Sequence, residues 1–432
     1  MSLEMMSFIL AGGLIILLAI GVEVFAAVGI AAAIGLFFLD QPLSQFSHTF
    51  FNSLNSFVLT AVPLFIFMGA IFSNTGMVRT LFTAVDKWTG NLPGGTASSV
   101  IGVNAVFGAM CGSSVAATAA FGKFAYPEME RLGYSPRLAL GALAVGGILS
   151  AAIPPSAILI VYGGLADVPV PRLFAGMLLP GIMLALLLIL TVVVQVKLKP
   201  SLVPKAPKVT WGERLTAIRD LLPWVGTIVL VLGVIFMGIM TPTEAAALGA
   251  FLSIVLAMAY RKLSMAVFKE SMWTAIRLTS MVAFLIFTAN VLGMVFIYMG
   301  LTELFSNSLL GLPFGKYGVI TAIAFMYIIG GMFINDWALL LLTIPFVLPV
   351  IRSLGFSPLW FGVWFVMIGE TGLITPPFGM NLFVLQSVVP KHDVLTIARG
   401  ALPFIIPMLI MAALLVVFPE LALWLPNLMF AR

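Results

Sequence analysis

The sequence predicts an all-α protein that crosses a membrane many times and is built from two related halves. Three observations predict this fold class. Hydrophobic residues make up 62% of the 432 residues and charged residues only 9%, with a mean hydropathy of +1.18. Many apolar stretches reach the roughly 20 residues that a helical span requires. Two of these stretches are interrupted by neighbouring prolines, Pro154 with Pro155 and Pro376 with Pro377, and the interruptions lie 222 residues apart.

Composition excludes several other classes of protein. A soluble domain carries roughly a quarter charged residues, so this chain has little room for one. The apolar runs are continuous rather than alternating, which excludes porin-type strands. The net charge of +5 comes from basic residues in short loops, where such residues set membrane topology. The charge therefore predicts a lipid bilayer as the surroundings and no nucleic acid as a partner.

The first half is predicted to cover residues 1–196. Its expected parts are scaffold helices within 7–72, a hairpin at 97–127, a broken helix at 138–165 and a helix at 173–196. A polar linker at 197–220 follows, and its basic residues are Lys197, Lys199, Lys205, Lys208, Arg214 and Arg219. The positive-inside rule makes this linker cytoplasmic.

The second half is predicted to cover residues 221–432 and to repeat the first. Its expected parts are scaffold helices within 221–300, a hairpin at 318–350, a broken helix at 358–388 and a helix at 401–425. The same 222-residue offset places the sequence GYSP before the first broken helix and GFSP before the second. The amphipathic segments 73–90 and 261–277 are either interfacial arms or plain loops.

Equivalent loops of the two halves differ in charge, which predicts opposite orientations. Arg131 and Arg137 precede the first broken helix, whereas the equivalent residues 353–359 are not basic. Segment 261–277 carries four basic residues and its counterpart, 39–55, carries none. Basic loops lie on the cytoplasmic side. We therefore expect an inverted repeat, an arrangement typical of secondary transporters.

The stretches 97–127 and 318–350 are expected to enter the membrane and return as re-entrant hairpins. The charge assignments put both ends of the first stretch on the cytoplasmic side, with Ser113 and Ser114 near its tip. Asn335 and Asp336 occupy the equivalent tip of the second stretch. Neighbouring prolines stop a helix and remove backbone donors. In lipid, carbonyls freed in this way are tolerated only where protein, water or an ion meets them.

Each hairpin tip would then face a broken helix, and oxygen atoms of both would line the space between them. Hydroxyl, amide and carboxylate oxygens together with free carbonyls suit a hard cation such as Na⁺. Asp336 is the sharpest indication, because a carboxylate within the membrane costs at least ~2.5 kcal/mol. The structural alternatives are close helix packing for Ser113 and Ser114, and capping of the hairpin turn for Asp336.

Other polar residues lie near the breaks. Ser150 and Ser156 flank the first break, and Thr375 and Asn381 flank the second, where they could meet a polar substrate. Glu370 is expected to fix the second break by bonding its free backbone groups. Lys123 lies among apolar residues, and it either neutralises an anionic substrate or extends its ammonium group to the interface.

Motifs of other functions are missing. The sequence has no P-loop and therefore no self-contained ATP motor. Only His48 and His392 occur, both near loops, so no histidine within the membrane can serve Ser113 or Ser114 as a base. We therefore expect a transport protein and no enzyme. A channel is a further alternative, since broken helices and re-entrant loops also occur in selectivity filters.

Five strings resemble one family: GAMCGSSVAATAA, GGILSAAIPPSAILIVYG, TPTEAAALGA, GMFINDWA and ITPPFGMNLFV. Together they resemble the large membrane subunit, DctM-like, of tripartite ATP-independent periplasmic (TRAP) transporters, over essentially the whole chain. The resemblance implies an elevator-type transporter of the ion transporter superfamily in a bacterial inner membrane. It also implies a small four-helix membrane subunit as a separate chain, and a periplasmic binding protein that delivers an organic anion.

The resemblance further implies Na⁺-coupled uptake of a carboxylate such as a C4-dicarboxylate, a sugar acid or a sialic acid. Carried over to this sequence, the first Na⁺ site comprises Ser113, Ser114, Ser150 and Ile153. The second Na⁺ site comprises Asn335, Asp336, Gly372 and Thr375. The substrate would contact Ser113, Ser156, Thr375 and Asn381. A stand-alone Na⁺-coupled carboxylate transporter of the same architecture is the alternative.

Overall fold

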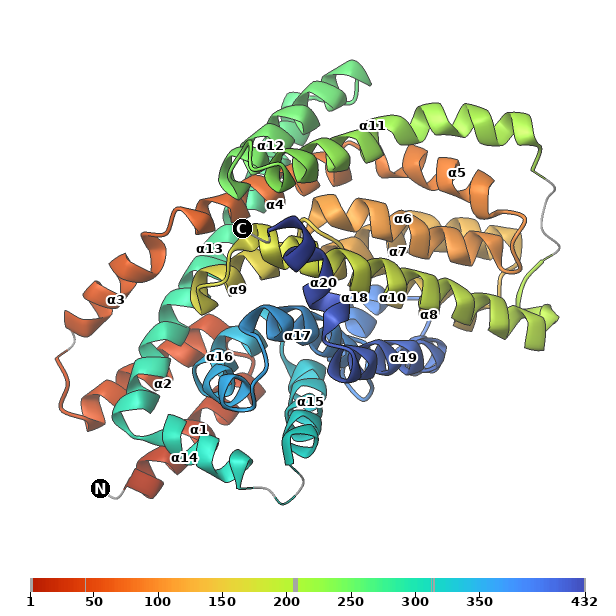
Figure 1. Cartoon of the computed structure of the whole chain (residues 1–432). Helices are drawn as coiled ribbons and strands as arrows, with labels where there is room; N and C mark the ends of the chain where they lie inside the picture. Colours follow the sequence, from red (N-terminus) through yellow and green to blue (C-terminus); the bar gives the residue numbers. More distant parts are fainter. Residues whose placement is uncertain (1–2, 43, 205–208, 312, 314, 431–432) are drawn as a thin grey trace.

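The computed structural model describes residues 3–42, 44–204, 209–311, 313 and 315–430. Within these ranges it contains twenty α-helices, two short 3-10 helices and no strand (Figure 1). The prediction of an all-α chain is therefore confirmed. Lys205 and Lys208 of the expected linker lie outside the described residues.

The helices of the first half are α1 (Leu3–Ala19), α2 (Val24–Phe38), α3 (Ser44–Leu54), η1 (Val58–Thr60), α4 (Ala61–Asn74), α5 (Val78–Thr89), α6 (Gly95–Cys111), α7 (Ser114–Leu132), α8 (Pro136–Ala152), α9 (Ala157–Ala166) and α10 (Val170–Leu198). After η2 (Pro200–Leu202), the chain continues with α11 (Trp211–Phe236), α12 (Pro242–Ala259), α13 (Met265–Tyr298), α14 (Leu301–Leu310), α15 (Gly315–Phe333), α16 (Asp336–Ser353), α17 (Pro358–Leu373), α18 (Met380–Val388), α19 (Val394–Val417) and α20 (Glu420–Met429).

Seven of the described helices are long and apolar enough to cross a membrane, namely α10, α11, α12, α13, α15, α16 and α19. The count rises to nine if each of two bent pairs forms one span. The first pair, α3 with the η1–α4 segment, is bent by 67°, and the second, α8 with α9, by 41°. These spans agree with the expected polytopic membrane protein.

Several expected helix boundaries are wrong. Helix α11 begins at Trp211, so the expected linker 197–220 contains the first turns of a helix. Thr210 and Glu213 form a capping box at this start, which begins the helix ahead of its apolar part. The helix expected at 401–425 is α19, beginning at Val394, followed by the separate α20. The amphipathic segment 261–277 lies mostly within the first part of α13 and is therefore not a plain loop.

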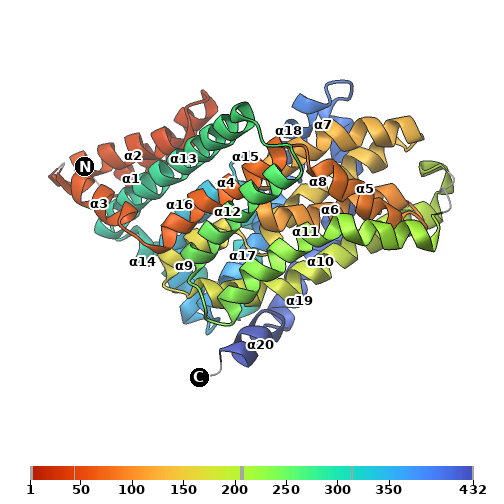
Figure 2. The same cartoon turned by 90° about the horizontal axis from the view of Figure 1, so that it is seen from above.

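Two helices made almost wholly of small or apolar residues lie at the centre of the molecule. Every residue of α8 from Leu138 to Ala152 is buried, and so is every residue of α17 from Leu359 to Leu373. Helix α8 packs on α6, α7 and α19. Figures 1 and 2 show α1, α2 and α3 at one end of the molecule and α5, α6 and α7 at the other. Each Pro-Pro break thus lies just after the C-terminal end of one of these two buried helices.

Candidate ion and substrate site

The first helix tip is built by a glycine and a serine. Helix α6 ends at Cys111, and Gly112 adopts φ +63°, in the left-handed region that glycine enters without strain. Ser113 is the N-cap of α7, and its hydroxyl accepts a hydrogen bond from the Ala116 N–H at 3.4 Å. The chain therefore reverses within two residues and leaves Ser114 at the first turn of α7.

The second tip uses an asparagine in the same role. Helix α15 ends at Phe333, and Asn335 is the N-cap of α16, with its Oδ1 atom accepting from the Ala338 N–H at 2.8 Å. Asp336 is the first residue of α16 and is 6% exposed. Ser113 and Asn335 each use one side-chain lone pair as a cap. The oxygen in each case keeps another lone pair for a ligand.

The broken helices end as the proline pairs predict. Helix α8 ends at Ala152, with Ile153 extended, and α17 ends at Leu373. Both Pro-Pro peptide bonds are cis. The Thr375 hydroxyl donates to the Thr371 carbonyl at 2.6 Å, while Gly379 N–H donates to the Met332 carbonyl at 3.0 Å. The last contact ties the second break to the second tip.

Glycines let each tip approach its broken helix closely. A Cβ atom added to Gly108 would lie 2.4 Å from Ser150 Cα, and one added to Gly331 would lie 3.0 Å from Gly372 Cα. Any larger residue would push these helices apart. The structure therefore brings Ser150 next to the first helix pair, α6 with α7, and Gly372 next to the second, α15 with α16.

Several predicted residues are buried and have no internal partner. Ser150, Ser156 and Asn381 are each 0% exposed. Among the described residues, their hydroxyl groups and both amide atoms of Asn381 lack a hydrogen-bond partner. Buried polar groups are costly unless they are paired. The breaks thus present unused hydrogen-bonding groups, which is what a site for an ion, water or a polar solute requires.

The predicted role of Glu370 is wrong. Its side chain is 1% exposed, and it lies beside the side chains of Asp336 and Ser114. Neither carboxyl oxygen makes a hydrogen bond of good geometry within the described part of the chain, so Glu370 does not satisfy backbone groups at the break. Instead, α17, α16 and α7 bring two carboxyl groups and a hydroxyl group together across the two halves. A carboxylate in an apolar run is a signal that could have placed Glu370 in the site.

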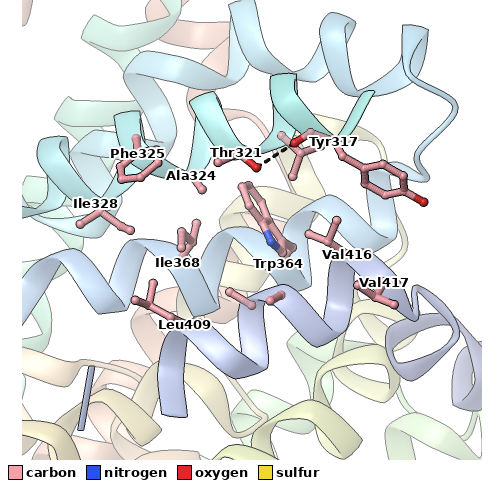
Figure 3. A pocket seen from close by; sticks show the side chains of 13 residues that line it. Tyr317, Thr321, Ala324, Phe325, Ile328, Trp364, Ile368, Leu409, Val416 and Val417 are labelled. Carbon is pink, nitrogen blue, oxygen red and sulfur yellow. Dashed lines mark hydrogen bonds between the residues drawn. The ribbon is translucent and has the colours of Figure 1, made fainter. Parts of the chain in front are cut away.

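The remaining predicted residues are less enclosed. Ser113, Ile153, Asn335 and Thr375 are partly exposed, and each lies at a helix end. An apolar cavity of about 300 Å³ between α15, α17 and α19 is distinct from this site, because none of the predicted residues lines it. Figure 3 shows the ring of Trp364 projecting in this cavity between Thr321 and Val416. Its apolar lining does not suit a polar solute.

The arrangement of helices is similar to that of two solved membrane proteins. The YdaH transporter of Alcanivorax borkumensis superposes with a TM-score of 0.57 at 12% identity, covering 88% of this chain and 87% of that chain. The MtrF protein of Neisseria gonorrhoeae, described among antimetabolite efflux pumps, has the same TM-score at 14% identity, covering 95% and 97%. At such identities the likeness concerns the fold alone.

Sequence comparison defines the family. The model of the "Tripartite ATP-independent periplasmic transporter, DctM component" family matches residues 11–421. The C4-dicarboxylate TRAP transporter large permease protein of Vibrio cholerae is 30% identical over 98% of this chain and 97% of its own length. The ectoine TRAP transporter large permease protein of Halomonas elongata is 29% identical over 98% and 100%, and the sialic acid large permease protein of Vibrio cholerae is 29% identical over 87% and 88%.

The chain therefore belongs to the DctM family of TRAP transporter large permease subunits. It is a multi-pass inner-membrane protein of a transport family and no enzyme.

Proposed function

We propose that this chain is the permease of a Na⁺-coupled importer that receives an organic anion from a periplasmic binding protein. One observation supports this proposal. Each of two helix tips packs closely against a broken helix, and the polar groups near these contacts are not satisfied by hydrogen bonds within the described part of the chain. Ser150, Ser156 and Asn381 are buried and have no hydrogen-bond partner in the described part of the chain, and Asp336 lies beside Glu370. Two carboxyl groups in an apolar environment favour a bound cation.

The proposal includes two Na⁺ sites. The first uses the Ser113 and Ser114 hydroxyls with Ser150 and the backbone at Ile153, where α8 ends. The second uses Asn335 and Asp336 with the backbone at Gly372 and with Thr375. All donors are oxygen atoms, which Na⁺ prefers. The close approach of Gly108 to Ser150 and of Gly331 to Gly372 supports these pairings.

The two halves form an inverted repeat in this proposal. Pro136 begins α8 and Pro358 begins α17, while Ser114 begins α7 and Asp336 begins α16. Each pair differs by 222 residues, the spacing of the Pro-Pro breaks. Opposite orientation follows from the loop charges. The hairpins α6–α7 and α15–α16 would enter from opposite faces, and together with the broken helices they would move as an elevator against a scaffold.

The substrate is an organic anion held between the two tips by Ser113, Ser156, Thr375 and Asn381. The family's named relatives include permeases for C4-dicarboxylates and sialic acid, which are carboxylic acids. Neutral hydroxyl and amide groups can hold a carboxylate when a bound cation offsets its charge. The charge of Na⁺ would therefore contribute directly to substrate affinity, which is the physical basis of the coupling.

The partners follow from membership of the family. A small four-helix membrane subunit would pack on the scaffold helices α1–α4 and α11–α13. These helices expose large apolar side chains, among them Phe37 and Leu222, which suit either lipid or such a subunit. The periplasmic binding protein would dock on the outer face and select the acid.

Uptake into proteoliposomes tests this function. The chain would be reconstituted with its small subunit, with a cognate binding protein and a labelled acid outside. An inward Na⁺ gradient would be imposed or omitted, and the binding protein added or left out. Accumulation that needs both supports the proposal. Accumulation with Na⁺ alone would favour a stand-alone carrier. No accumulation of an acid that the binding protein demonstrably binds would refute the coupling.

A further inference from the structure

A charged cleft lies between the amphipathic helix α5 and the first helix pair. Figures 1 and 2 show α5 beside α6 and α7. The cleft has a volume of about 720 Å³, within the usual size range of small-molecule sites. Its polar lining residues are Arg79, Thr83, Asp86, Thr96, Lys123, Glu128 and Arg131. None of these residues belongs to the ion and substrate sites described above.

The charges in this α5–α7 cleft do not cancel. Arg131 pairs with Glu128 through two hydrogen bonds, of 2.5 and 3.0 Å, so that these two residues neutralise each other. Asp86 accepts a hydrogen bond from the Ser99 hydroxyl at 2.6 Å. Arg79 and Lys123 form no salt bridge within the part of the chain that the structure describes. The cleft therefore keeps one positive charge in excess.

The position of the cleft separates it from the helix tips. Lys123 lies nine residues beyond Ser114 on α7, which is about 14 Å along a helix. It lies toward the end that carries Arg131, and basic loop residues are on the cytoplasmic side. An anion that leaves the tip region toward the cytoplasm would thus pass an uncompensated positive cleft beside the first hairpin.

We propose that the α5–α7 cleft is a second anion site, at which Arg79 and Lys123 bind the carboxylate of the organic acid on its way to the cytoplasm. This proposal rests on the proposed function. The two cations attract a carboxylate, while Asp86 keeps the net charge low enough for the acid to leave again. Exposed charges bind weakly, as a release site requires. The phosphate group of an anionic lipid has related chemistry, and the experiment separates the two sources.

A cysteine reporter inside the cleft tests the proposal without any transport. Thr83 lines the cleft and is exposed, so Thr83→Cys places a thiol there in the full chain with its small subunit in nanodiscs. A membrane-impermeant maleimide would modify it with or without succinate or N-acetylneuraminate, at equal ionic strength set by chloride. Thr80→Cys, on α5 but outside the cleft lining, is the matched control. The unsubstituted chain, whose only cysteine is the buried Cys111, gives the background.

In phosphatidylcholine nanodiscs, a transported acid at ten times its dissociation constant should slow modification of Thr83→Cys roughly tenfold, because about a tenth of the clefts remain empty. Thr80→Cys should react at an unchanged rate. Adding Lys123→Gln or Arg79→Gln should raise the concentration for half-protection by about threefold to fivefold, whereas Lys87→Gln, on α5 but outside the cleft, should not.

Two results would overturn the proposal. The first is an unprotected Thr83→Cys with an acid that the proteoliposome assay shows to be transported, which would leave the proposed function intact. The second is protection by phosphatidylglycerol nanodiscs alone that added acid does not change, which would assign the cleft to lipid. Loss of Na⁺ coupling in the uptake assay would leave this binding readout unaffected, so failure of one proposal is distinguishable from failure of the other.

Discussion

At the scale of single residues, several buried polar groups lack a hydrogen-bond partner among the residues that the structure describes. Ser150, Ser156 and Asn381 are fully buried, and Asp336 and Glu370 place two carboxyl groups side by side. Such groups destabilise a fold unless something else meets them. In the proposed function, these groups at the breaks are met by the bound ion and substrate.

Asp336→Asn tests the second Na⁺ site at this scale. Replacing the carboxylate with an amide removes the charge that would attract the cation, so the Na⁺ concentration for half-maximal uptake should rise about tenfold or more. Uptake would be measured against external Na⁺ at equal protein levels. Glu303→Gln, an exposed acid on α14, should leave the curve unchanged. An unaltered Na⁺ dependence in Asp336→Asn would remove Asp336 from the site.

At the scale of elements, the two halves are joined by close helix packing. A Cβ atom added to Gly141 of α8 would lie 2.1 Å from the Gly400 carbonyl oxygen, and one added to Gly400 of α19 would lie 2.2 Å from the Arg137 carbonyl oxygen. These contacts are with backbone atoms, which cannot move aside as a flexible side chain can. Glycine at both positions is what allows α8 and α19 to lie against each other.

Gly141→Ala should therefore destabilise the protein. The added methyl group would force α8 away from α19 at a cost of about 1–3 kcal/mol. The thermal unfolding midpoint in detergent would report the loss. Gly164→Ala is the matched control, because the nearest atom to its added Cβ is 3.7 Å away, in ordinary contact. Equal midpoints for both variants would show that α8 and α19 do not pack as described.

A polar contact joins the end of α7 to the loop between α18 and α19. Lys391 Nζ donates to Glu130 Oε1 at 2.6 Å, and Tyr126 hydrogen-bonds His392. The hydrogen bond from Lys391 holds the pKa of the Glu130 carboxyl below its usual range. The pair links residues of the first and second halves outside the apolar core.

This contact should contribute less at acidic pH. Because the folded pKa of Glu130 is lowered, its contribution is complete above the usual glutamate pKa of about 4.3 and disappears as the pH falls through the lower folded value. The difference in unfolding midpoint between the native chain and Glu130→Gln should therefore be present from about pH 8 to 5 and shrink below about pH 4. A difference that grew as the pH fell from about 5 to about 3 would contradict the assignment.

At the scale of the whole molecule, the proposed inverted repeat makes a topological prediction. Arg131 and Ser353 are equivalent under the 222-residue offset, and both are exposed. An inverted repeat places them on opposite sides of the membrane. A cysteine introduced by Arg131→Cys should react with an impermeant reagent only from the cytoplasmic side, and one introduced by Ser353→Cys only from the outside. Reaction from the same side would reject the inversion.

The sequence alone determined the class of the protein and its two Pro-Pro breaks, but not the 67° bend between α3 and the η1–α4 segment. Continuous apolar runs mark spans because lipid tolerates little else, and each proline pair ends a helix because it removes donors. Both features, the apolar runs and the proline pairs, are local and can be read directly from the amino-acid sequence. The family strings around Ser113, Asp336 and Thr375 carried the assignment further, and the DctM match confirmed it.

Only the tertiary structure decided how separate segments meet. It showed that α11 starts with the Thr210 cap, ahead of the apolar run, and that α19 and α20 are separate helices. It also placed Glu370 beside Asp336 and Ser114, residues far apart in the chain. Hydropathy records how apolar a segment is, whereas these contacts depend on which helix faces pack together, and that is settled by close packing between distant segments.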